Sequence, residues 1–120
     1  MKILVTGCAG FVGFSLCKKI LDSNNHKIFG IDNLNNYYDV NLKKSRLNIL
    51  KKNKKNFFFT KLDIKDKKKI LNYFKKNKFD IVIHLAAQAG VRHSIQNPKT
   101  YFENNVLGFF NILEASKEIK

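Results

Sequence analysis

Acidic residues, proline, tryptophan and cysteine are scarce in this chain, which has nine Asp and Glu, one Pro, two Cys and no Trp. Its apolar runs are far shorter than the roughly 20 residues of a membrane-spanning helix. We also expect no signal peptide, because the N-terminus has no long apolar stretch with a cleavage site. The two cysteines, Cys8 and Cys17, form neither a CxxC pair nor a cluster with metal-binding spacing, so we predict no metal site. These absences favour a cytoplasmic protein with free thiols and no membrane partner.

The scarcity of acids leaves a strong positive charge. Lysines and arginines number 23, which gives a net charge of +14, as in many proteins that bind nucleic acids or anionic membranes. However, Arg46 and Arg92 are the two arginines, and the lysines cluster at 51–55, 65–69 and 75–78, as on solvated helix faces. We therefore attribute the charge to a composition bias and predict no nucleic-acid partner. A basic nucleic-acid-binding α/β module, whose affinity would fall steeply with salt, remains an alternative.

The chain has 120 residues, of which 44% are hydrophobic, enough for the core of one domain. Four apolar segments are typical of strands: 2–6, 27–31, 56–62 and 79–86. A helix is predicted after each, the second over about 40–52, the third capped by Asp66, and the last opened by Asn97-Pro98 after a loop at Gly90. The alternation βαβαβαβα predicts an α/β fold, an incomplete Rossmann-type doubly wound parallel sheet in the order 3-2-1-4. The last helix is expected to bury an apolar stripe: Tyr101, Val106, Phe109, Phe110 and Leu113.

The glycine-rich segment Thr6–Gly13 lies between the first predicted strand and its helix. Gly7 permits a tight turn, Gly10 lets a pyrophosphate approach the backbone, and Gly13 lets the helix pack closely. Asp32 ends the second strand 19 positions after Gly13, where a carboxylate binds a ribose diol and repels a 2′-phosphate. Since no lysine or arginine immediately follows Asp32, the pattern favours NAD over NADP as the cofactor.

Three other positions allow both a structural and a chemical role. Asp63, followed by Ile64, could contact an adenine amino group or cap a helix. His84 lies inside the fourth predicted strand, where a hydrogen-bonded core histidine is favoured over a catalytic base. Cys8 could have a lowered thiol pKa near a helix N-terminus, but a small residue tolerated in a glycine turn is favoured.

Five stretches of the chain carry a family resemblance. They are Val5–Gly13, Gly30–Val40, Lys61–Ile64, Ile83–Arg92 and Asn104–Gly108. With them the chain resembles the N-terminal part of the extended short-chain dehydrogenase/reductase family, the NAD-dependent epimerases and dehydratases. Within that family it is most similar to the nucleotide-sugar epimerases, of the UDP-glucuronate 4-epimerase type.

The resemblance implies a set of cofactor and substrate contacts. Gly7, Gly10 and Gly13 would form the phosphate-binding turn. The other NAD contacts would be Phe11 and Val12 at the pyrophosphate, Asp32 and Asn33 at the adenosine, Asp63 and Ile64 at adenine, Leu85, Ala86, Ala87 and Gln88 at the nicotinamide ribose, and Asn104. Val91 and Arg92 would face the nucleotide sugar, although Arg92 could equally be a solvated loop charge.

In this family NAD takes a hydride from C4 of the sugar, the 4-keto sugar rotates, and the hydride returns to the opposite face. The base is a tyrosine assisted by a lysine four positions later. None of the four tyrosines here is followed by such a lysine, so we assign no catalytic residue. We expect the tyrosine–lysine pair and the sugar-nucleotide domain to lie beyond Lys120. Residues 1–120 alone should be catalytically inactive and able to self-associate, and the complete enzyme should be a homodimer. A related dehydratase or decarboxylase would share the same half-site.

Overall fold

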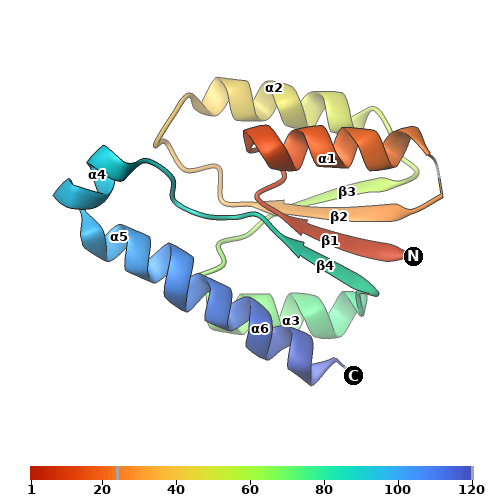
Figure 1. The fold of residues 1–120 in the computed structure, drawn as a ribbon. Coiled ribbons are helices and arrows are strands. Elements are labelled where there is room, and N and C mark those ends of the chain that lie inside the picture. Colours follow the sequence, from red (N-terminus) through yellow and green to blue (C-terminus); the bar gives the residue numbers. More distant parts are fainter. Residues whose placement is uncertain (24, 120) are drawn as a thin grey trace.

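The computed structural model describes residues 1–23 and 25–119 and contains one sheet flanked by helices (Figure 1). The strands are β1 (Lys2–Thr6), β2 (Lys27–Asp32), β3 (Phe57–Lys61) and β4 (Ile81–His84). The helices are α1 (Phe11–Asp22), α2 (Val40–Lys51), α3 (Lys67–Asn77), α4 (Val91–Gln96), α5 (Pro98–Phe102), the π-helix η1 (Glu103–Gly108) and α6 (Phe109–Glu118). The strand order is β3-β2-β1-β4 with parallel neighbours, which confirms the predicted doubly wound fold.

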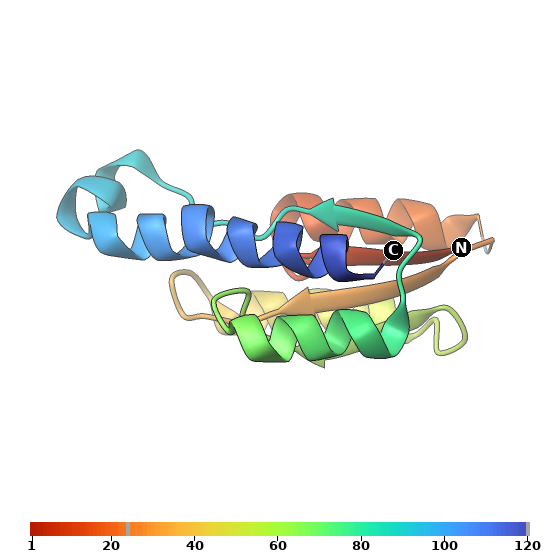
Figure 2. The same cartoon turned by 90° about the horizontal axis from the view of Figure 1, so that it is seen from below.

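The helices form two layers around the sheet. Helices α1 and α2 cover one face, and α3 and α6 lie side by side on the other (Figure 1 and Figure 2). Along β1, Ile3 and Val5 belong to the core that includes α1 and α2, whereas Leu4 belongs to the core of α3 and α6. Successive strand side chains point to opposite faces, so a strand covered on both sides is apolar throughout. None of the described helices combines the length and apolar character needed to cross a membrane.

Helix starts agree with the sequence in two places and differ in one. The Asp66 carboxylate accepts a hydrogen bond from the Lys69 amide at 3.1 Å, which confirms the predicted N-cap of α3. Helix α5 begins at Pro98, also as predicted. The predicted loop after strand β4 is wrong in its second half, because α4 follows Gly90, whose φ of 102° makes the turn into that helix.

Strand β4 is shorter than the predicted segment 79–86. The register with β1 ends at the pair Thr6 and His84. The Leu85 amide then donates to both the backbone oxygen of Thr6, at 3.3 Å, and its hydroxyl oxygen, at 3.0 Å, and the Ala86 amide donates to the hydroxyl oxygen alone, at 3.0 Å. The Thr6 side chain therefore takes over from the Thr6 backbone as the acceptor where the chain leaves the sheet. The segment after His84 is consequently free to form the wall of a cleft.

The predicted buried stripe of the last helix is wrong. Val106, Phe109, Phe110 and Leu113 are exposed, and the face turned toward the sheet and α3 carries Asn104, Gly108, Asn111, Ile112 and Ala115. Both sets have helical spacing, so periodicity alone does not choose between them. Close approach decides the choice, because a Cβ on Gly108 would lie 2.6 Å from the Ile64 side chain. The small residues let the helix pack where the larger apolar side chains would not fit.

Strand β4 generates a prediction about association. It pairs with β1, and no other described strand covers its outer edge. We expect a chain of residues 1–120 to self-associate through this edge, more at high salt, because salt screens repulsion between molecules of charge +14. Ile81 is 38% exposed and Ile83 packs on the core, so Ile81→Lys is the variant that charges the edge without disturbing the fold.

Sedimentation velocity at low and high salt measures this association. The Ile81→Lys chain should remain largely monomeric at a salt concentration where the parent chain associates. A parent chain that is monomeric and folds cooperatively under both conditions would contradict the prediction.

Candidate functional site

A cleft lies at the carboxyl ends of the parallel strands, where ligands bind in folds of this type. Its cavity volume is about 170 Å³. The predicted site residues that line it are Gly7, Gly10, Asp32, Asn33, Ile64, Leu85, Ala86, Ala87, Gln88 and Asn104. The structure thus brings together residues from five separate segments of the chain.

The glycine turn is held tightly against the opposite wall of the cleft. Gly7 has a φ of 72°, and a Cβ there would lie 2.9 Å from the backbone nitrogen of Ala86. A Cβ on Gly13 would collide with the carbonyl oxygen of Gly7, so the first turn of α1 packs directly on the turn before it. Gly10 lines the cleft just before α1 begins, where unpaired helix amides favour an anion.

Asp32 is fixed by two backbone amides. Its Oδ2 accepts a hydrogen bond from Ala9 at 3.1 Å and its Oδ1 accepts one from Leu34 at 2.8 Å. The first bond links the end of β2 to the glycine turn, and the second folds the following loop back on the carboxylate. Each oxygen of an ionised carboxylate can accept a further hydrogen bond, so Asp32 can also receive hydroxyl donors from the cleft.

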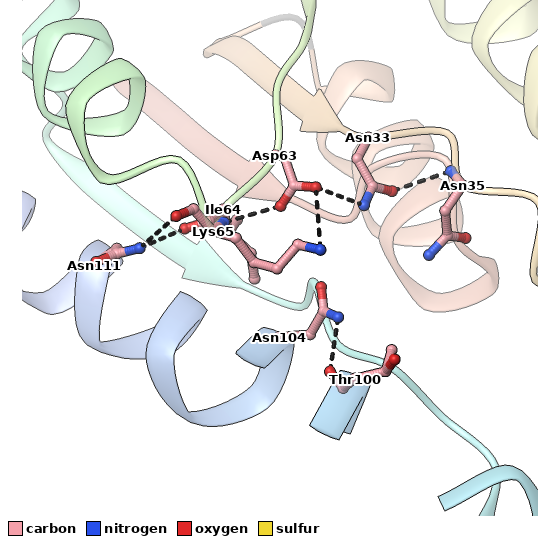
Figure 3. Close-up of polar contacts among 8 residues, drawn as sticks. All are labelled: Asn33, Asn35, Asp63, Ile64, Lys65, Thr100, Asn104 and Asn111. Carbon is pink, nitrogen blue, oxygen red and sulfur yellow. Dashed lines mark hydrogen bonds and ion pairs between the residues drawn. The ribbon is translucent and has the colours of Figure 1, made fainter. Parts of the chain in front are cut away.

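Asn33 and Asp63 face one another from the ends of β2 and β3 (Figure 3), with Asn33 Nδ2 3.4 Å from Asp63 Oδ2. Asp63 Oδ1 accepts the Lys65 amide at 2.9 Å. The helix-capping alternative for Asp63 is wrong, since Asp66 caps α3. Ile64, not Asp63, lines the cleft, so the apolar member of the pair faces the space directly.

Asparagines of the last helical segment hold two walls of the cleft. The Asn105 side chain makes two hydrogen bonds to the backbone of Gln88. The Gln88 backbone N–H donates to Asn105 Oδ1 at 2.8 Å, and Asn105 Nδ2 donates to the Gln88 backbone oxygen at 3.0 Å. Asn111 Nδ2 donates to the carbonyl of Ile64 at 2.9 Å (Figure 3). Asn104 is buried and lines the cleft, and its amide donates to the Thr100 carbonyl at 2.8 Å. Sequence analysis missed Asn105, although it lies in a stretch that carries the family resemblance.

His84 has a structural role set by Thr6. The Thr6 hydroxyl oxygen accepts two backbone amides, which leaves its proton for His84 Nδ1 at 2.8 Å. His84 must then be unprotonated at Nδ1, and its ring stacks on Phe109. Burial lowers the pKa of His84, which also favours the neutral ring. The contacts support the predicted core histidine rather than a base facing substrate.

The two cysteines are buried, and burial raises the pKa of both thiols, that of Cys17 to about 12. A thiol reacts as its thiolate, so neither side chain is poised for chemistry. This supports the structural interpretation of Cys8 in the glycine turn.

Several predicted residues lie outside the cleft lining. Phe11 and Val12 are exposed on the first turn of α1, at 76% and 60%. Val91 and Arg92 lie on α4, which projects beyond the sheet (Figure 1). Conversely, the cleft includes residues that the sequence analysis did not select: Ile31, Asn35, Tyr37, Tyr38, Lys43, Leu62 and Ala89. Lys43 has the helical spacing of a residue on the same face as buried Leu47 and Leu50. This spacing indicates burial, but a lysine is expected on a solvated face.

Burial of His84, which lowers its pKa, predicts that stability depends on pH. The folded-state pKa of His84 lies below its ordinary value of 6.5, so at higher pH the ring is neutral in both states. As pH falls through 6.5 the unfolded chain takes up a proton first, so folding stability decreases. We expect the unfolding midpoint to drop between pH 8 and 5 by less in His84→Asn, whose amide oxygen accepts the Thr6 proton without titrating.

Thermal unfolding followed by circular dichroism across this pH range tests the effect, with His93→Asn as the matched control. An equal drop in the parent chain and in His84→Asn would assign the pH dependence to other groups.

Comparison with known proteins agrees with this geometry. A family model described as GDP-mannose 4,6 dehydratase matches residues 4–120. Protein CapI of Staphylococcus aureus is 45% identical over 117 residues, covering 98% of this chain and 34% of that protein. A probable UDP-glucuronate 4-epimerase of Rhizobium meliloti (strain 1021) is 40% identical, with 99% and 34% coverage. The chain therefore spans about a third of the length of these curated relatives.

Among solved structures, the chain is similar to the UDP-glucuronic acid 4-epimerase of Bacillus cereus in complex with UDP-glucuronic acid and NAD. The TM-score is 0.90 at 36% identity, covering all of this chain and 37% of that one. These matches confirm the predicted resemblance to NAD-dependent epimerases and dehydratases. Because the family model spans nearly all of its residues, the chain belongs to the family described as GDP-mannose 4,6 dehydratase.

Proposed function

We propose that residues 1–120 form the N-terminal part of an NAD-binding domain in a nucleotide-sugar epimerase that acts on UDP-glucuronate. The observation that carries the proposal is the position of Asp32, which faces the same cleft as the glycine turn and is fixed by backbone amides at both oxygens. This arrangement suits a ribose diol beside a pyrophosphate. The similarity to a Bacillus cereus epimerase whose structure holds NAD and UDP-glucuronic acid supports the choice of cofactor and substrate.

In this proposal each part of the cleft holds one part of NAD. Gly7 and Gly10, with the exposed start of α1 at Phe11 and Val12, would receive the pyrophosphate, since α1 has no acidic residue in its first turn to compete for the amides. Gly13 would support that turn from behind. Asp32 would accept the ribose hydroxyls.

The remaining walls would hold the two ring systems. Asn33 would stay on the adenosine side, with Ile64 packing on adenine and Asp63 close behind it. The nicotinamide ribose would lie along Leu85, Ala86, Ala87 and Gln88, which the Thr6 hydroxyl and Asn105 hold in place, with Asn104 beside them. Bound NAD would supply the hydride acceptor for the reaction.

The substrate and the remaining catalytic groups are part of the same proposal. Val91 and Arg92, on the projecting helix α4, would face the nucleotide sugar, and the complete enzyme would be a homodimer. The Tyr-x-x-x-Lys pair and the sugar-nucleotide domain would follow further along the protein. The DNA after codon 120 tests this division: an in-frame continuation that encodes the pair supports it, and a stop codon contradicts it.

The family description favours a second candidate, a nucleotide-sugar dehydratase. It would share the same cofactor half-site and differ in the later residues. Assay of the complete protein with UDP-glucuronate and with GDP-mannose separates the two candidates, since the epimerase should convert the first sugar nucleotide to UDP-galacturonate.

Asp32 yields the first functional prediction. We expect the protein to bind NAD more tightly than NADP. Asp32→Ala should reduce the difference between the two affinities. Loss of the charge-assisted hydrogen bonds to ribose, worth roughly 1.5–3 kcal/mol, should weaken NAD binding by about tenfold or more. Titration calorimetry with both cofactors measures the two affinities. Equal affinity of the unaltered protein for NAD and NADP would refute the assignment of Asp32.

The missing catalytic pair yields the second. A chain limited to residues 1–120 should not convert UDP-glucuronate to UDP-galacturonate even with NAD present, because it has no tyrosine followed four positions later by lysine. Chromatography of the nucleotide sugars after incubation with highly purified chain is the measurement. Turnover that scales with the concentration of this chain would show that another residue supplies the base.

A further inference from the structure

Lys43 is a buried cation at the ribose end of the cleft. It lies on α2, is 4% exposed, and lines the cleft together with Asp32. Its ammonium donates to the backbone oxygen of Asn35 at 2.7 Å and to the Asn35 side-chain oxygen at 2.8 Å, and it lies 4.2 Å from the centre of the Tyr38 ring. These partners are neutral, so none of them cancels the positive charge of Lys43.

Arg46 brings a second cation to the same place. Its Nη1 donates to the Ala9 carbonyl at 3.1 Å and to the Tyr38 hydroxyl at 3.3 Å. Ala9 is also the residue whose amide binds Asp32 Oδ2, so the guanidinium and the carboxylate are attached to one residue of the glycine turn. Arg46 lies one helical turn from Lys43 on α2, with Tyr38 between the two cations.

Asp32 lines the same cleft as Lys43 but is paired with neither cation. No ion pair joins it to Lys43 or Arg46 within residues 1–23 and 25–119. Burial lowers the pKa of Lys43, and this is the largest effect on it. The negative charge of Asp32 nevertheless raises that pKa, and the positive charge of Arg46 lowers it. The three charges therefore act on the same space without neutralising one another by contact.

We propose that Lys43, supported by Arg46, is a second determinant of cofactor discrimination, a built-in cation site for a ribose 2′-phosphate that the Asp32 carboxylate blocks. This inference rests on the proposed function. The sequence places no lysine or arginine directly after Asp32, but the fold places two beside it from the next helix. Lys43 and Asp32 then have opposite effects on a 2′-phosphate, and NAD is preferred because the effect of the carboxylate is the larger one.

The mechanism predicts how the two residues combine. With Asp32 present, repulsion of the 2′-phosphate offsets its attraction to Lys43. With Asp32 removed, the buried ammonium can form a charge-assisted hydrogen bond to the phosphate, a stronger bond than a neutral one. The gain in NADP affinity on Asp32→Ala should therefore depend on Lys43, and NAD affinity should depend on it much less.

Titration calorimetry with NAD and NADP on four purified proteins tests this: the unaltered protein, Asp32→Ala, Asp32→Ala with Lys43→Met, and Asp32→Ala with Lys44→Met. Lys44 is the exposed neighbour on α2, so its variant removes the same charge without touching the cleft. We expect Asp32→Ala to bind NADP about tenfold more tightly than the unaltered protein does, and Lys43→Met to abolish that gain. We expect Lys43→Met to change NAD affinity by less than about threefold and Lys44→Met to change neither affinity selectively.

A Lys43 variant could also loosen the loop at Asn35, so Arg46→Gln in the Asp32→Ala background provides a second measurement. Glutamine can still donate to the Ala9 carbonyl, and the loss of charge should weaken NADP selectively. The inference would be overturned if Asp32→Ala increased NADP affinity equally with lysine or methionine at position 43, and with arginine or glutamine at position 46. That result would leave the proposed NAD site intact. Failure of the folded, unaltered protein to bind NAD would instead overturn the proposed function and the inference with it.

Discussion

The cleft depends on one contact, between the end of β1 and the chain leaving β4. The Thr6 hydroxyl accepts the amides of Leu85 and Ala86, and the adjacent Gly7 has no side chain to keep those residues away. The Thr6 side chain is buried, so leaving its hydroxyl without partners would cost roughly 1–3 kcal/mol. The contact therefore holds the opposite wall of the cleft close to the glycine turn.

The wall that Thr6 begins is completed by asparagines rather than by apolar packing. Asn105 pairs with the backbone of Gln88, and Asn111 binds the carbonyl of Ile64 on the other side of the cleft. An amide side chain can satisfy a donor and an acceptor of an irregular backbone at once, which an apolar residue cannot. The helix face that carries Asn111 lies close to the sheet, and Gly108 and Ala115 are buried on it while larger apolar residues face outward.

Sequence patterns predicted the parts of this molecule that follow from local rules. The strand order, the glycine turn, the cap at Asp66 and the position of Asp32 all follow from periodicity, helix capping and the handedness of crossovers. The end of β4 could not be predicted from local rules, because it depends on the Thr6 hydroxyl, which lies 79 residues from Leu85 in the chain. Nor could the buried face of the last helix, since two faces have the same period and the choice between them is made by how closely Gly108 approaches Ile64.

The same limit applies to charge. Counting lysines gives a strongly basic chain whose cations are expected on solvated faces, and for most positions that inference needs no structure. Lys43 differs because helix α2 presents it on the face shared with Leu47 and Leu50, where the Asn35 oxygens and the Tyr38 ring replace water around the ammonium. In our proposal, the buried cation changes the role of the Asp32 carboxylate. Instead of selecting a ribose diol in a neutral cleft, the carboxylate opposes a positive field. In our proposal, cofactor choice in this cleft is a balance between charges from different elements, so no single position in the sequence encodes it.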